Sequence, residues 1–240
     1  MNHFKRYILF WLSQALSQLG SAMTGFALIL WAYTQDGSAM TVSLLSFFQY
    51  IPYIAASVFA GSFVDRHSKK KIMLAADSAA AACSVIIFAL SMCGRLSIWN
   101  IYAANFIGGF MNAFQGPAAA VAVGRVVPKD KVKQISGMNS FSGNMVTVLS
   151  PVLAAALFAW GGLPLVLLID LASFGFAFLV LLFVLQIPET AEKQAKSGSA
   201  FAGSREGIAY LRGNRLILRI MLTMAVLISF PDLPMKTFFL

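Results

Sequence analysis

Long stretches without a charged residue are the feature of this sequence that most constrains its fold. Tyr7 to Gln35, Gly37 to Val64, Ser78 to Gly94 and Leu96 to Gly124 contain no Lys, Arg, Asp or Glu. A helix that crosses ~30 Å of hydrocarbon needs roughly 20 predominantly apolar residues, so each stretch supplies most or all of one span. Only 11% of the residues are charged, whereas a soluble domain carries about a quarter. The sequence therefore predicts an integral membrane protein.

A fifth uncharged stretch, Gln134 to Ile169, is too long for a single span. It contains WGGLP at residues 160–164, where Gly-Gly followed by Pro predicts a turn between two helices. The alternating segments of about 10 residues that are typical of membrane β-strands do not occur, so we expect an all-α fold. The expected spans are about 8–33, 41–63, 72–93, 97–123, 138–160 and 164–187, with a seventh that begins near 216.

The basic residues predict the orientation in the membrane. All but two of the 18 lie before span 1, after spans 2, 4 and 6, or at the start of span 7. Cytoplasmic loops are rich in Lys and Arg, so this side and the N-terminus are predicted to be cytoplasmic, in the plasma (inner) membrane. We expect residues 1–188 to form a six-helix bundle, 189–214 a cytoplasmic central loop with a short helix, and 215–240 the start of a second half. Topology thus explains the net charge of +9, and the expected partner is membrane lipid rather than nucleic acid.

The sequence offers little for enzymatic chemistry. It contains no nucleotide-binding loop, no cluster of metal ligands and no pairing of a nucleophile with a base. Cys83 and Cys93 lie on one predicted helix about 15 Å apart, at ~1.5 Å per residue, which is too far for a disulfide. We therefore expect no enzymatic activity, no metal site and no cofactor.

The loop between spans 2 and 3 carries the densest group of charges in the chain. Its sequence meets the spacing G-x-x-x-D-R-x-x-[RK]-[RK] with Gly61, Asp65, Arg66, Lys69 and Lys70. This loop resembles the signature that the major facilitator superfamily carries between spans 2 and 3, although Ser68 stands where the family often has Gly.

Further stretches are similar to the macrolide-efflux and siderophore-exporter branch of that superfamily. They are FWLSQALSQLGSAMTGFAL in span 1, FQGPAAAVAVGRVVPKDKV after span 4, LIDLASFGFAFLVL in span 6 and EGIAYLRGNRLI before span 7. Span 5 departs from the exporter pattern, because Ala154 and Ala155 replace its last two glycines. The resemblance implies a six-helix bundle built as a 3+3 inverted repeat.

Whole members of the superfamily have twelve spans in two halves, and the resemblance covers spans 1 to 6 and part of span 7. The chain ends at SFPDLPMKTFFL within the expected seventh span. We therefore expect a C-terminal half to be missing, because the chain is a fragment or an interrupted reading frame. A natural half-size unit that dimerises is the alternative.

The resemblance implies that the loop between spans 2 and 3 is a gate. Asp65 would hold the two halves together in the outward-facing state, and Arg66 would fix the loop. The simpler interpretation gives the following lysines, Lys69 to Lys71, no role in the gate. They would only set the orientation of the protein, at the anionic leaflet of the membrane. Asp77 lies about one and a half turns into span 3. We expect it to pair with Arg66 or another loop cation, either supporting the gate or relaying protons.

Asp170 is an acid within the sixth predicted span, six residues after Pro164. Intramembrane acids face the bundle interior or a water-filled cavity and are functional candidates by default. Proton coupling is one hypothesis for Asp170, and a hydrogen-bonded role in fixing span 6 against its neighbours is the other.

Uncharged polar residues indicate the inward faces of several spans. Gln14 and Gln18 lie one turn apart on span 1, and Ser21 and Gly25 continue the stripe. The remaining candidates for cavity lining are Asn105 and Asn112 in span 4 and Asn144 in span 5. Hydrogen bonding between helices is the alternative role for all of them.

The sequence as a whole predicts a secondary active transporter that works by alternating access. We expect proton-coupled efflux of a small amphipathic compound, such as a drug, a macrolide or a siderophore-like molecule. The alternatives are a truncated membrane scaffold or interaction subunit that does not transport, and an uptake transporter of the same fold.

Overall fold

The computed structural model describes residues 3–126, 131–183, 213–214, 216–221 and 223. The helices are α1 (His3–Asp36), α2 (Ala39–Arg66), α3 (Lys69–Met92), α4 (Ile98–Val126) and α5 (Val132–Phe183). All five are long and apolar enough to cross a membrane, and the described residues include no strand. The predicted all-α membrane bundle is confirmed.

Short turns between the helices follow from a few local residues. Gly37 adopts φ 63°, a left-handed conformation that ends α1 and that glycine adopts without strain. Ser38 then caps α2 by accepting from the Thr41 amide, and Asp36 accepts from the Ser38 amide at 3.0 Å and the Thr41 hydroxyl at 2.6 Å. The chain therefore reverses within two residues, and α2 begins slightly before the predicted boundary at residue 41.

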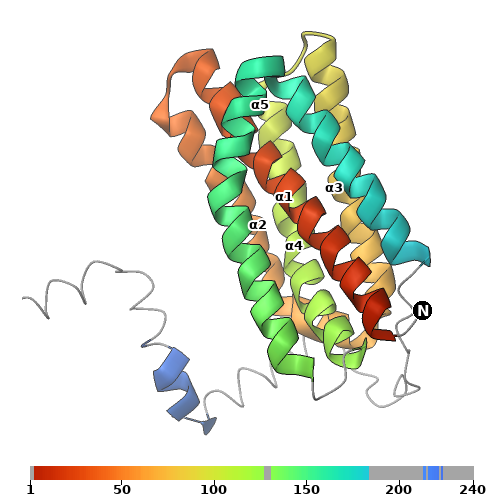
Figure 1. The fold of residues 1–240 in the computed structure, drawn as a ribbon. Coiled ribbons are helices and arrows are strands. Elements are labelled where there is room, and N and C mark those ends of the chain that lie inside the picture. The colour runs from red at the N-terminus through yellow and green to blue at the C-terminus, as the bar shows by residue number, and fades with distance from the viewer. Residues whose placement is uncertain (1–2, 127–130, 184–212, 215, 222, 224–240) are drawn as a thin grey trace, which may run out of the picture. The chain divides into compact units, whose positions relative to one another are not determined.

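The longest helix, α5, contains the predicted turn. Gly162 has non-helical backbone angles of φ 67° and ψ −169°, and this kink divides α5 into two helical segments. Figure 1 shows the chain reversing direction there, so that the two segments run in opposite directions with α1 between them in this view. WGGLP thus predicts the division correctly, and α5 supplies the expected fifth and sixth spans.

Each helix packs mainly against one or two of the others. Most contacts join α1 to α5, α2 to α4, and α3 to α4 and α5. α2 and α4 approach closely at Gly109, where a Cβ atom would overlap the Gln49 carbonyl and meet Pro52 Cγ at 3.2 Å. Small residues allow such packing between membrane helices. Large apolar side chains such as Phe47, Ile54 and Leu153 remain exposed, as expected for surfaces that contact lipid.

Several helix ends that carry basic residues lie at one end of the bundle. The start of α1, the turn between α2 and α3, the end of α4 and the start of α5 share this end (Figure 1). Their clustering agrees with the alternation in the sequence, while the assignment of this end to the cytoplasm stays a prediction.

The described residues from 213 onwards belong to a second unit of the chain, 194–240. Residues 216–221 within it are helical, at the point where the seventh span is predicted to begin. The rest of that span, and nearly all of the predicted central loop with its short helix, lie outside the described residues.

Candidate functional site

Asp170 lies in the bundle interior where α1, α3 and α5 meet. Its carboxylate accepts hydrogen bonds from Ser21 and Thr24 of α1, at 3.1 and 3.0 Å, and from Ser84 of α3 at 3.4 Å. Only 4% of Asp170 is exposed. Hydroxyl groups from two other helices thus surround one buried acid, and we call this group the Asp170 cluster.

A glycine on α1 makes this close approach possible. A Cβ atom at Gly20 would lie 2.5 Å from Ser173 Oγ and 3.0 Å from Asp170 Oδ1. Ser173 itself donates to the Asp170 backbone carbonyl at 2.8 Å. Because Ser21 and Thr24 are three residues apart, they lie on the same face of α1 and reach the carboxylate together.

A cavity of about 210 Å³ adjoins the Asp170 cluster. Thr24, Ser84, Gln49 and Asn105 line it together with Asp170, which is its only charged residue. Among the described residues no cation pairs with the acid, so its hydrogen-bond donors are neutral hydroxyls. This arrangement is suited to exchange of a proton at Asp170, because only neutral dipoles compensate the charged form.

A second cavity, of about 480 Å³, lies between α1, α3, α4 and α5 and holds the first half of the predicted stripe of span 1, whereas Ser21 and Gly25 line the cavity beside Asp170. Gln14 and Gln18 both line it, together with Trp11 and Asn139. The Trp11 indole nitrogen and the Gln14 amide nitrogen are buried without a hydrogen-bond partner in the described part of the chain. Unpaired buried donors are uncommon, and a bound ligand or water would satisfy them.

The predicted asparagines differ in their surroundings. Asn105 lines the cavity beside Asp170 and also donates to the Leu45 carbonyl at 3.1 Å, which joins α4 to α2. Asn112 and Asn144 are exposed and line neither of these two cavities. Their role as cavity residues stays a prediction.

Two lysines of the predicted loop, which the structure places in the first turn of α3, bind helix ends. Lys69 is 7% exposed and donates to the Asp65 backbone carbonyl at 3.0 Å. Lys70 donates to the Leu182 carbonyl at 2.9 Å, in the last turn of α5. The last carbonyls of a helix lack intrahelical partners, and cations near this end also interact favourably with the helix dipole. These lysines therefore do more in the fold than mark orientation.

The other residues of the loop signature are more open. The Asp65 side chain is exposed, while Arg66 is half-buried. A Cβ atom at Gly61 would meet nothing within 4 Å, so packing among the described residues does not explain this glycine.

The predicted partner of Asp77 was wrong. We expected Arg66 or another loop cation, but the Gln115 side-chain amide of α4 donates to the Asp77 carboxylate. The reason is packing, because α3 and α4 lie side by side and Asp77 is two turns from the amino end of α3. At that depth a neutral amide from the neighbouring helix is nearer than the loop.

Three functional candidates were missed in the sequence. Thr24 continues the polar stripe of span 1, three residues after Ser21, and this spacing could have identified it. Ser84 and Trp11 carry no comparable signal, because an isolated Ser or Trp in an apolar run is common in membrane helices. Only the meeting of separate helices brings Ser84 to Asp170 and Trp11 to Gln14.

Comparison with known proteins gives a consistent family. The model of the Major Facilitator Superfamily matches residues 10–239. Macrolide efflux protein A of Streptococcus pyogenes is 28% identical over 240 residues, which is 99% of this chain and 59% of the relative. Macrolide efflux protein A of Enterococcus faecalis is 28% identical over 204 residues, with 85% and 62% covered.

A more distant relative is the uncharacterized MFS-type transporter YfiS of Bacillus subtilis. It is 23% identical over 222 residues, which is 90% of this chain and 51% of YfiS. The chain thus spans 59% of the length of the streptococcal relative, and less than two thirds of each of the others.

Proposed function

The chain belongs to the Major Facilitator Superfamily, and from this premise we propose that it is the N-terminal half of a proton-coupled exporter. The exporter would move a small amphipathic compound across the plasma membrane by alternating access. The observation that carries this proposal is the Asp170 cluster, a buried acid whose partners among the described residues are neutral hydroxyls.

The physical argument for coupling begins with the cost of charge in the membrane. An ionised acid near the bilayer centre costs ~2.5–3.5 kcal/mol on insertion scales. Three hydroxyl donors offset part of this cost, and protonation removes the rest. Because the hydroxyls come from α1 and α3 while the acid is on α5, loss or gain of the proton changes how strongly these helices hold together.

The loop between α2 and α3 is proposed to be the gate. Asp65 is exposed at the end of α2, where it can accept hydrogen bonds from an element of the second half. Lys69 binds the carboxyl end of α2, and Lys70 binds the carboxyl end of α5. Both lysines thereby fix the position of the loop next to Asp65. The support is this geometry together with the loop signature.

The substrate site is proposed to include the 480 Å³ cavity beside Gln14 and Gln18. Its lining residues carry no charge, and Trp11 and Gln14 each have a donor that no described residue pairs with. An uncharged, oxygen-bearing part of an amphipathic compound would satisfy both. The names of the relatives make macrolides the first compounds to test.

The test is protection from macrolides in cells that lack their own pumps. The full-length product of the gene should lower intracellular macrolide and raise resistance, and Asp65→Asn should remove the protection. Unchanged accumulation with the wild-type protein at the membrane would contradict the proposal. Flux measured in both directions in vesicles then separates export from uptake.

A further inference from the structure

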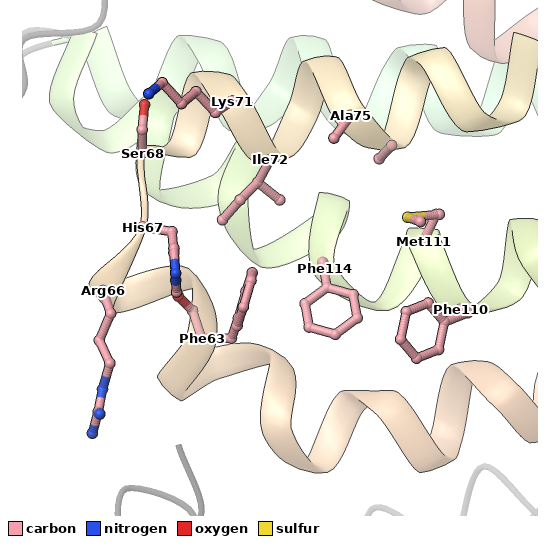
Figure 2. Close-up of a pocket in the computed structure, with 11 residues that line it drawn as sticks. Phe63, Arg66, His67, Ser68, Lys71, Ile72, Ala75, Phe110, Met111 and Phe114 are labelled. Carbon is pink, nitrogen blue, oxygen red and sulfur yellow. The ribbon is translucent and has the colours of Figure 1, made fainter. Parts of the chain in front are cut away.

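A third cavity lies between the carboxyl end of α2, the amino end of α3 and the middle of α4. We call this cavity of about 600 Å³ the α2–α3 groove. Phe63, Ile72, Phe110, Met111 and Phe114 converge on it in Figure 2. Phe63 packs edge-on against Phe114 with ring centroids 5.3 Å apart, and Phe110 lies 5.2 Å from Phe114. The body of the groove is thus apolar and largely aromatic.

One end of the groove is basic. Arg66 and Lys71 belong to its lining and lie toward the same end in Figure 2, where the Arg66 side chain points away from the aromatic rings and Lys71 extends toward Ser68. Lys71 is exposed, whereas Lys69 and Lys70 bind helix carbonyls. Positive charge therefore lies at the membrane-face end of an apolar groove, and the positive end of the α3 dipole adds to it.

The geometry points to a binding site for an anionic phospholipid in the α2–α3 groove. The phosphate of the headgroup lies at Lys71 and the amino end of α3, and one acyl chain lies along Phe63, Phe114 and Phe110. This site differs from the proposed substrate cavity, which is lined from α1, α3, α4 and α5. It depends neither on the transported compound nor on the direction of transport.

Three properties of the groove select this ligand. Its volume falls within the range of ~300–1,000 Å³ that binding sites usually have. Its polarity is divided along its length, with aromatic side chains in the body and cations at one end, which matches an amphiphile with an anionic head. A membrane helix bundle is surrounded by phospholipid, and basic pockets between helices on the cytoplasmic side bind such headgroups.

The consequence is a link between lipid composition and the gate. Lys71 follows Lys70, which donates to a carbonyl in the last turn of α5, and the groove lining includes Phe63 and Arg66, before and after Asp65 in the chain. A headgroup bound at Lys71 would therefore stabilise the short connection between α2 and α3, next to Asp65. Depletion of anionic lipid should loosen this connection without altering the Asp170 cluster.

The test uses the purified full-length protein, freed of lipid and titrated with phosphatidylglycerol or phosphatidylcholine under native mass spectrometry. We expect a tightly bound phosphatidylglycerol and weaker phosphatidylcholine. Lys71→Gln should weaken phosphatidylglycerol binding about fivefold, the factor that corresponds to ~1 kcal/mol per basic residue at an anionic surface. Phosphatidylcholine binding should stay unchanged.

The matched control is Lys133→Gln, an exposed lysine in the first turn of α5 that does not line the groove. It should leave the affinity for both lipids unchanged. Equal losses in Lys71→Gln and Lys133→Gln would overturn the site, because they indicate general attraction to charge. Equal affinities of the wild-type protein for the two lipids would overturn it as well.

A second variant tests the apolar body. Ala75 lines the groove and is exposed, so Ala75→Phe should fill the space and weaken binding of both lipids while thermal stability is retained. Unchanged lipid binding in this variant would place the lipid elsewhere and overturn the proposal. Soluble glycerol phosphate should fail to displace the bound lipid at equal concentration, and full displacement would indicate a phosphate site instead.

Discussion

Asp65 and Asp170 lie in opposite surroundings within one bundle. Asp65 is exposed at the end of α2, and four cations follow it within six residues. Asp170 is 4% exposed, and its partners among the described residues are the hydroxyls of Ser21, Thr24 and Ser84. The Asp65 side chain is thus open to water, whereas the partners of the Asp170 carboxylate among the described residues are neutral dipoles.

This difference assigns different work to the two acids. A carboxylate that stays charged can bind and release a partner, as the proposed gate requires. A buried carboxylate whose partners are neutral dipoles is suited to gain a proton, because its charged form is costly in hydrocarbon and protonation removes that cost. The comparison leads to four predictions, which begin with the largest effect.

Asp170→Asn should abolish proton-driven accumulation against a gradient. Asparagine keeps the size of the side chain and can still accept from Thr24 or Ser84, but it cannot exchange a proton. Downhill exchange of substrate should persist. The measurement is uphill and downhill flux in vesicles at matched protein content, with pH-dependent uphill flux in the variant as the contradicting result.

Asp65→Asn should slow transport by about tenfold or more while the pH dependence keeps its shape. The variant would weaken the hydrogen bond that the proposed gate makes to the second half. A hydrogen bond to a charged group is worth ~1.5–3 kcal/mol, and a loss of about 1.4 kcal/mol is about tenfold. Flux as a function of pH is the measurement. A shift of the whole pH profile in Asp65→Asn would contradict the proposal that Asp65 acts in the gate and Asp170 in proton exchange.

Gly20→Ala should destabilise the bundle by ~1–3 kcal/mol, the usual cost of overpacking, because its Cβ atom would meet Ser173 and the Asp170 backbone. The matched control is Gly25→Ala on the same helix, where a Cβ atom would meet nothing within 4 Å. That variant should be neutral or slightly more stable. Thermal unfolding in detergent decides between them, and equal stability of the two variants would argue against close packing at the Asp170 cluster.

Lys70→Gln should have the smallest effect, a loss of ~0.3–1 kcal/mol of stability from weaker interaction with the last turn of α5. The loss should shrink in high salt, because salt screens exposed charges. Lys133→Gln serves as the control at the same end of the bundle. A salt-independent loss in Lys70→Gln would indicate lost packing instead of lost charge.

The sequence predicted the helices better than their contacts. Charge-free runs located the spans, and WGGLP located the division of α5 at Gly162, because length and turn chemistry are local properties. The predicted boundaries fall short of the observed ends by a few residues, as at Asp36 and Arg66. Helices continue past the apolar region, and hydropathy does not register this continuation.

The candidate site was predicted in part. Asp170 could be singled out because an acid in an apolar run is rare, but its hydroxyl partners come from two other helices. Asp77 shows the same limit, since proximity in sequence favoured Arg66 while helix packing supplied Gln115. Hydrogen-bond partners that come from a neighbouring helix cannot be predicted from one sequence, because the sequence does not show which helices pack together.

The most direct test of the division between Asp65 and Asp170 is the number of protons moved per molecule of substrate exported. It is measured with a pH-sensitive dye and labelled substrate in vesicles that contain the full-length protein. We predict that Asp65→Asn keeps the wild-type ratio at a lower rate, and that Asp170→Asn exchanges substrate without moving protons. An unchanged proton ratio in Asp170→Asn would contradict the account.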